Sequence, residues 1–130
     1  DSVPISQMSQ LRYVMEDNKL GIASCMFKFG EKTSLTLYSQ RKETRLPFKI
    51  DAWITAADPF FGMEAACGAV WTDRATCIIK LELLEYKQMF ILTCCFRDDT
   101  LLLQIKPFGA LKTDHLDVDL AGTVTEDLIR

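Results

Sequence analysis

The sequence predicts an all-β domain in which one antiparallel, up-and-down sheet of about eight short strands curls or closes on itself. Apolar and polar residues alternate with a period of two through much of the chain, and turn residues separate the alternating runs. Outside the N-terminal region, no run has helical spacing over three turns. Closure is expected because it removes the two exposed edges of an open sheet.

Three alternating runs are expected to form strands in the first half of the chain. They cover residues 23–29, 34–39 and 46–50. Pro47 lies in the third run and has no backbone N–H to donate, so this strand should lie at a sheet edge or begin there. Residues 6–17 fit a short helix or a first strand equally well, and we leave both alternatives open.

The second half shows the alternation more clearly. Residues 77–85 alternate apolar and charged positions, whereas residues 89–96 are apolar on both faces and should form a central strand. The charged segment 97–100 is a predicted turn that sends the chain back through residues 101–105. Residues 116–120 alternate strictly, which predicts one buried face and one solvated face.

The adjacent cysteines Cys94 and Cys95 would suggest a redox or metal site only if both thiols could act together. Neighbours on a strand point to opposite faces, so we expect two unpaired and largely buried thiols instead. The five cysteines include no C-x-x-C pair and the chain has a single His, so neither a metal site nor a cofactor is expected. Reduced thiols favour a reducing compartment such as the cytoplasm.

Size and charge restrict the function classes. A chain of 130 residues can bury a core without a disulfide or metal, so we treat residues 1–130 as one domain. The net charge is −3 and the basic residues are scattered, which argues against nucleic-acid binding. The apolar runs are too short to span a bilayer. The chain starts at Asp1 without an initiator Met or signal peptide, so a processed product or an excised domain is expected.

Two groups of residues are candidates for a functional role. Ser39 and Lys42 match the S-x-x-K motif of penicillin-recognising enzymes, but on one strand they would point to opposite faces, so catalysis is not expected. Aromatic residues and one acid could line a ligand pocket inside a barrel, or the aromatics could simply fill its core. The candidate ligand-binding residues are Trp53, Trp71, Glu82, Tyr86 and Phe90. An outward, solvated position is favoured for Glu82.

The segment Gly68–Tyr86, GAVWTDRATCIIKLELLEY, and residues 92–103 resemble the C-terminal β-domain of bacterial serine β-lactamase-like (penicillin-binding-protein-like) hydrolases. Residues 18–22, 46–53 and 119–123 extend the resemblance over most of the chain. The resemblance implies a lipocalin-like barrel. No catalytic residue carries over, because the family's catalytic groups lie in a preceding domain. Lys49 departs from the pattern, since the family often has a Gly there.

The first hypothesis is therefore a non-catalytic accessory β-domain, excised from the C-terminus of a longer hydrolase, that supports the catalytic domain or its assembly. Its implied partners are the preceding catalytic hydrolase domain and a possible second copy of the chain. The alternative is a stand-alone lipocalin-like barrel that binds a small molecule, and a third hypothesis is a hydrolase using Ser39 and Lys42. A carrier predicts an enclosed cavity of about 300 Å³ or more, whereas an accessory domain predicts a filled interior. Family members are often exported, so the compartment stays undecided.

Overall fold

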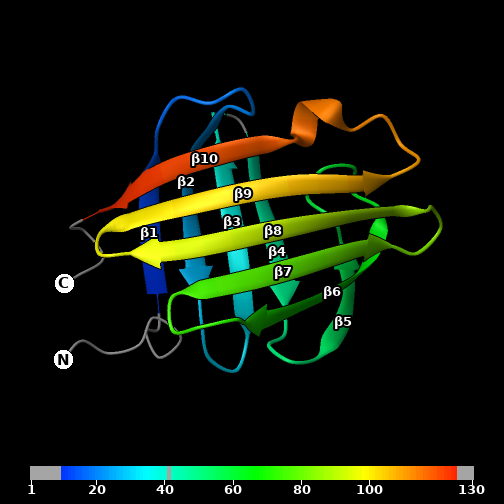
Figure 1. Ribbon diagram of the computed structural model, residues 1–130, viewed down its shortest axis with the longest axis horizontal. Coiled ribbons are helices and arrows are strands. Elements are labelled where there is room, and N and C mark those ends of the chain that lie inside the picture. The colour runs from blue at the N-terminus through cyan, green and yellow to red at the C-terminus, as the bar shows by residue number, and fades with distance from the viewer. Residues whose placement is uncertain (1–9, 41, 126–130) are drawn as a thin grey trace.

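The computed structural model describes residues 10–40 and 42–125, which form one antiparallel sheet of ten strands curled into a barrel (Figure 1). The strands are β1 (Gln10–Met15), β2 (Ile22–Lys28), β3 (Thr33–Ser39), β4 (Lys42–Phe48), β5 (Trp53–Ala57), β6 (Glu64–Trp71), β7 (Thr76–Leu83), β8 (Gln88–Arg97), β9 (Thr100–Gly109) and β10 (Val118–Val124). A short 3-10 helix, η2 (Asp114–Leu116), precedes β10. The predicted all-β, up-and-down barrel is confirmed. It has ten strands rather than about eight, because small residues and the Asp58-Pro59 break obscure the alternation in β5 and β6.

The N-terminal region contains a strand where the sequence allowed either a strand or a helix. Residues 10–15 form β1, and residues 6–9 lie outside the described part of the chain. Tyr13 and Met15 are buried while Val14 between them is exposed, which is the alternation of a half-buried strand. No helix in the described residues is long and apolar enough to cross a membrane.

The sheet closes between β1 and β10 and stays open between β4 and β5. Its strand order is β4-β3-β2-β1-β10-β9-β8-β7-β6-β5, so β4 and β5 are the two edges. The prediction that the strand containing Pro47 lies at an edge is confirmed, since β4 pairs only with β3. The connection between β4 and β5 partly bridges the opening: Ala69 of β6 accepts a hydrogen bond from the N–H of Asp51 (2.7 Å) and donates one to the carbonyl of Lys49 (2.9 Å).

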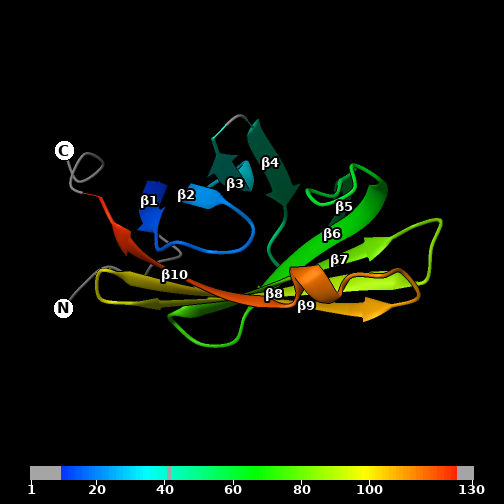
Figure 2. The ribbon, with the colours of Figure 1, turned by 90° about the horizontal axis from the view of Figure 1, so that it is seen from above.

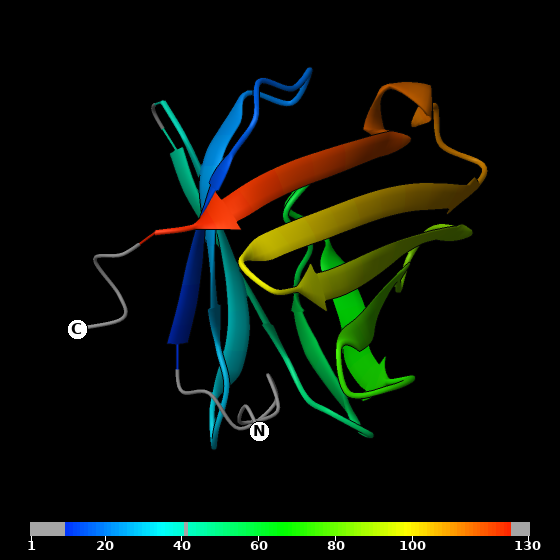
Figure 3. The ribbon, with the colours of Figure 1, turned by 60° about the vertical axis from the view of Figure 1, so that its left-hand side comes forward.

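Two crossed layers enclose the core. Strands β1–β4 form one layer, and strands β7–β10 form most of the other (Figures 2 and 3). Each strand turns alternate side chains toward the other layer, so the inner faces of both layers meet in one continuous apolar cluster. The inward residues therefore decide what the barrel interior can hold.

A glycine allows strands β1 and β10 to approach each other closely at the pairing that joins the two layers, which we call the seam. Gly122 of β10 lies opposite Met15 of β1. A Cβ atom on Gly122 would come within 2.5 Å of the Met15 sulfur and 2.9 Å of the Val14 carbonyl oxygen. Any other residue at this position would push β1 and β10 apart.

The adjacent cysteines lie in the β8–β9 hairpin, as predicted. Cys94 is fully buried and faces inward, whereas Cys95 faces outward and is half-buried; neither forms a disulfide. Arg97 pairs with Thr100 across the predicted turn, and Asp98 adopts a positive φ of 52° there. Asp tolerates this left-handed conformation better than most residues, which explains its place in so tight a turn.

Candidate functional site

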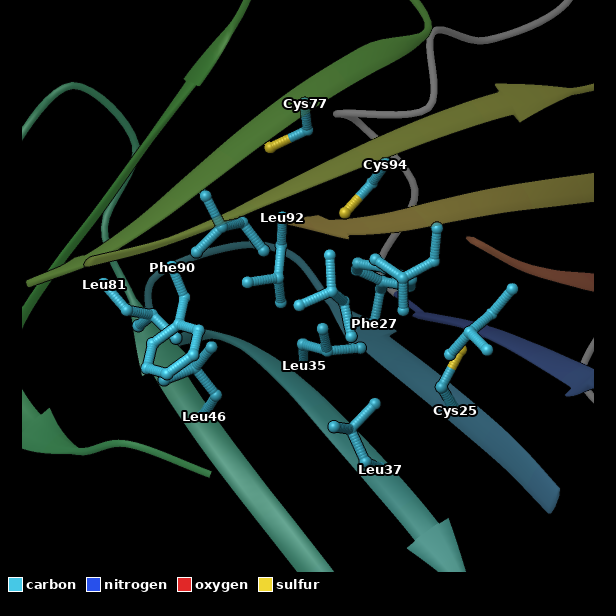
Figure 4. Packing of buried hydrophobic residues seen from close by; sticks show 14 of the residues in the cluster. Cys25, Phe27, Leu35, Leu37, Leu46, Cys77, Leu81, Phe90, Leu92 and Cys94 are labelled. Atoms are coloured by element: carbon cyan, nitrogen blue, oxygen red, sulfur yellow. The ribbon is translucent and has the colours of Figure 1, made fainter. Parts of the chain in front are cut away.

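The inner surface of the barrel is apolar on both layers. Figure 4 shows Phe27, Leu35 and Leu46 from one layer facing Leu81, Phe90 and Leu92 from the other. All six side chains are almost completely buried. These residues come from alternate positions of their strands, so the period-two pattern places them on one surface.

No cation is buried in the part of the chain that the structure describes. The buried polar side chains there are Thr33, Ser34, Thr36, Asp58, Gln88 and Thr113. Asp58 is the only charged residue among them, and its carboxylate accepts hydrogen bonds of 2.8 Å from the backbone N–H groups of Phe60, Phe61 and Met63. The side chain of Gln88 is bonded to Leu111 N–H and the Met89 carbonyl. The interior therefore offers dispersion contacts and no free charge.

Four thiols add to this apolar surface. Cys25, Cys67, Cys77 and Cys94 are all buried and unpaired. Burial raises the pKa of Cys25 and of Cys77 to about 12 and that of Cys67 to about 11, and it raises the pKa of Cys94 well above its ordinary value. They are neutral at physiological pH, so they act as small apolar groups. Within the described residues no three His, Cys, Asp or Glu side chains are placed to hold a metal ion.

One end of the barrel has a mouth that leads toward this interior. A cavity of about 180 Å³ opens there. We call it the mouth cavity; its lining residues are Leu20, Ile22, Leu37, Ser39, Lys42, Thr44, Pro59, Phe60 and Leu116. The ring of Phe60 packs against that of the fully buried Phe90, with a centroid distance of 4.8 Å. Ile22, Leu37 and Leu116 belong to the buried cluster, so core residues form part of the cavity wall.

An open groove of about 750 Å³ adjoins the mouth cavity and shares Leu20, Ile22 and Ser39 with it. The loop between β1 and β2 contributes Glu16, Asp17, Asn18, Leu20 and Gly21 to its wall. Asn18 fixes this loop: its side-chain amide donates to the carbonyls of Glu16 and Ile22 at 2.8 Å, and its Oδ1 accepts from the N–H groups of Leu20 and Ile22 at 3.1 Å. The loop therefore presents Leu20 at the rim in a defined position.

The far end of the barrel is filled by aromatic rings. Phe27 and Phe96 meet edge to face at 5.0 Å, and Trp71 lies 5.7 Å from Phe29 and 5.9 Å from Phe96. Tyr13 packs 6.1 Å from Phe96. This cluster separates the apolar interior from the charged turns beyond it.

The outer surface carries a competing apolar groove. It has a volume of about 380 Å³ and lies over β8, β9 and β10, with Cys95 and the half-exposed Leu102 in its lining. A test of ligand binding must therefore distinguish the inside of the barrel from this outer groove.

The structure separates the five candidate ligand-binding residues. Phe90 lies in the core and Trp71 lies in the aromatic cluster. Trp53 is 56% exposed because its neighbour Ile54 takes the inward position opposite Cys67. Glu82 is also exposed, as favoured from the sequence, and Tyr86 is 46% exposed in the turn after β7. Two of the five candidate residues, Phe90 and Trp71, therefore lie in the interior.

Most residues around the mouth were missed by sequence reasoning. Leu20 and Phe60 lie in loops, where no period marks the side that faces the cavity. Leu116 begins the alternating run 116–120, but it lies in η2 because β10 starts only at Val118. An apolar residue between charged or turn-forming neighbours was the one available signal, and it does not indicate which loops meet.

The expected geometry of Ser39 and Lys42 was wrong. The two residues end β3 and begin β4, so a tight turn places them directly opposite each other instead of on one continuous strand. Both line the mouth cavity. The Ser39 hydroxyl donates a hydrogen bond of 3.3 Å to the Lys42 carbonyl. The pair is therefore a feature of the mouth, with the Ser39 proton directed to a backbone oxygen.

Comparison with known proteins identifies the fold. No protein-family model matches the sequence, and no curated protein matches it. Three solved structures are similar over nearly the whole chain. A Schistosoma mansoni fatty acid binding protein in complex with arachidonic acid has a TM-score of 0.60 and 11% identity, over 94% of this chain and 96% of that one. Lipid binding protein 8 of Caenorhabditis elegans, in its apo form, has a TM-score of 0.61 and 14% identity, over 92% and 94%. Fatty-acid-binding protein 1 of Echinococcus granulosus has a TM-score of 0.59 and 13% identity, over 92% and 96%.

The resemblance to the C-terminal β-domain of serine β-lactamase-like hydrolases is wrong. The structures that match are lipid-binding barrels instead. Alternating strands joined by short turns recur in any antiparallel barrel, so the segment Gly68–Tyr86 carried the pattern of a strand pair and no family-specific group. The accessory function and the preceding catalytic hydrolase domain as partner rested on that resemblance, and both are corrected with it.

Proposed function

We propose that this chain binds a long-chain lipid inside its barrel. The observation that carries the proposal is the inner surface, which is apolar on both layers and contributes Ile22, Leu37 and Leu116 to the lining of the mouth cavity. Each methylene group moved from water into such an interior contributes about 0.8 kcal/mol, so about ten buried methylenes contribute roughly 8 kcal/mol before the costs of association.

The similar structures support the same class of ligand. Two are described as fatty-acid-binding proteins and the third as a lipid binding protein, and one of the three holds arachidonic acid. The similarity extends over more than nine-tenths of each chain, so it includes both the mouth and the interior. This supports the alternative of a stand-alone small-molecule-binding barrel over the accessory-domain hypothesis, and it suggests a lipid as the small molecule.

The size of the mouth cavity sets a condition on binding. Its volume of about 180 Å³ is below the range of roughly 300–1,000 Å³ typical of small-molecule pockets. A lipid chain therefore has to displace side chains of the inner surface. Strands β4 and β5 are not paired with each other. The barrel can therefore widen between these two strands with the loss of the fewest backbone hydrogen bonds.

The test is a titration of the delipidated protein with a fluorescent fatty acid, followed by displacement with an unlabelled one. Saturable binding at micromolar concentration and full displacement are expected. Delipidated, folded protein that gives no saturable signal up to the solubility limit of the probe would overturn the proposal.

Two variants locate the binding site. Leu37→Trp fills the mouth cavity, whereas Leu102→Trp fills the outer groove. We expect Leu37→Trp to weaken binding by about tenfold or more, because the chain must pass this side chain, and Leu102→Trp to leave it unchanged. The opposite ranking would place the ligand on the outside of β8–β10.

A further inference from the structure

We propose that an anionic lipid lies in this barrel with its hydrocarbon chain inward and its carboxylate at the mouth, beside Lys42 and Ser39. The inference rests on the proposed lipid-binding function and adds the orientation of the ligand and the chemistry of its head-group site.

In the part of the chain that the structure describes, the interior gives a carboxylate no cationic partner. An unpaired ionised group pays a large desolvation cost in an apolar environment, so buried charges in proteins are paired or neutralised. Among the described residues, the buried polar side chains include no Lys, Arg or His. The one buried charge, Asp58, is itself negative and is already bonded to three backbone N–H groups. A carboxylate drawn into the core would therefore lose its hydration without gaining a counter-charge.

The mouth supplies what the interior lacks. Lys42 is the one cationic residue in the lining of the mouth cavity, and it is exposed. It lies opposite Ser39 across the β3–β4 turn, and both residues line the same cavity as the apolar Leu37. A lipid whose chain passes Leu37 thus ends beside the Lys42 ammonium group while its head stays in contact with water. The Ser39 hydroxyl lies next to it but donates its proton to the Lys42 carbonyl, so the cation is the head-group partner.

The opposite end of the barrel disfavours the reverse orientation, because aromatic rings occupy it. Phe27, Phe29, Trp71 and Phe96 fill it, with ring centroids 5.0 to 6.4 Å apart. A head group directed that way would meet aromatic faces and edges before it reached any charged turn. The aromatic cluster is suited to the methyl end of the chain.

Orientation is measured with two stearic acid probes that carry an anthroyloxy fluorophore, one near the carboxylate and one near the methyl end. Both are bound to the whole protein, and quenching by acrylamide is compared. We expect the fluorophore near the carboxylate to be quenched more strongly. Stronger quenching near the methyl end would overturn the inference and leave the proposed function intact.

The head-group site is tested with Lys42→Gln, and Lys49→Gln serves as the matched control because Lys49 is an exposed lysine at the other end of the barrel. The ligands are stearic acid and the uncharged stearyl alcohol. An exposed ion pair predicts that Lys42→Gln weakens the acid about two- to five-fold and leaves the alcohol unchanged, with no effect of Lys49→Gln. An equal loss for both ligands, or no loss for the acid, would contradict the assignment. If neither ligand binds the unmodified protein, the proposed function itself fails.

Discussion

Removing the carboxylate of Asp58 should destabilise the protein. The loss of stability should grow with the number of backbone N–H groups that are left without a hydrogen-bond partner. Its Oδ1 accepts from the N–H groups of Phe60 and Phe61, and its Oδ2 accepts from that of Met63, each at 2.8 Å. Asp58 is buried, but the three donors lie in a loop that is partly open to water. Each lost bond should therefore cost about 1 kcal/mol, so Asp58→Ala is expected to lose about 3 kcal/mol.

Asp58→Asn separates the hydrogen bonds from the general effect of mutation. The amide keeps one oxygen, which can still accept from Phe60 and Phe61, but its NH2 group then faces the N–H of Met63. We expect a loss of about 1 kcal/mol from the unsatisfied donor, so the asparagine variant should lie clearly between the alanine variant and the unmodified protein.

Urea denaturation followed by circular dichroism measures both losses, and thermal unfolding should show about 3–6 °C per kcal/mol. Asp17→Ala is the control, because Asp17 is an exposed acid in the β1–β2 loop, and it should stay within about 0.5 kcal/mol of the unmodified protein. Equal losses for Asp58→Asn and Asp58→Ala, or losses no larger than the control, would refute the reasoning.

Three further outcomes follow from the seam and the thiols. Gly122→Val should lower the free energy of unfolding by about 2 kcal/mol or more in urea denaturation, because its Cβ would contact Met15 and Val14; an unchanged midpoint would contradict the tight seam. A thiol reagent at pH 8 should modify Cys95 first and the four inward thiols far more slowly. Raising the pKa of Cys25 from the ordinary thiol value of 9.0 to about 12 lowers its thiolate fraction about a thousandfold. Five equal modification rates in mass spectrometry would contradict the burial of the four thiols. The raised pKa of Cys25 and Cys77 also predicts that the contribution of these thiols to stability is fully present below pH 9 and is lost as pH rises toward 12, because the thiols of the unfolded chain release their protons first. The midpoints of urea denaturation at pH 8 and pH 10.5 measure this loss. Cys25→Ala should reduce the decline between the two pH values.

Much of the fold could be predicted because it follows from local alternation. Cys94 and Cys95 were assigned to opposite faces from their adjacency alone, and the structure buries one and half-exposes the other. The absence of a backbone donor at Pro47 predicted an edge strand, and β4 is an edge. Such properties depend on neighbouring residues and on the pleat, so they can be read from a short segment.

The candidate site was harder to predict because loops carry no period. Trp53 and Tyr86 were chosen as aromatic residues, yet both are exposed: one strand turns Trp53 outward, and Tyr86 lies in a turn. The pair Ser39 and Lys42 was expected on opposite faces, because the turn between them was not recognised. A tight turn reverses the chain, so two residues three apart become cross-strand partners.

The sequence by itself determined that the chain forms short antiparallel strands, which residues face inward in the strands that alternate clearly, and that this inner face is apolar. The tertiary structure alone decided that β1 pairs with β10, that β4 and β5 stay apart, and that Leu20, Lys42, Phe60 and Leu116 meet around one mouth. The physical reason is the distance along the chain over which each property is set. Side-chain direction is set residue by residue by the pleat, whereas closure depends on the summed twist and register of ten strands, and it brings together loops that are distant along the chain.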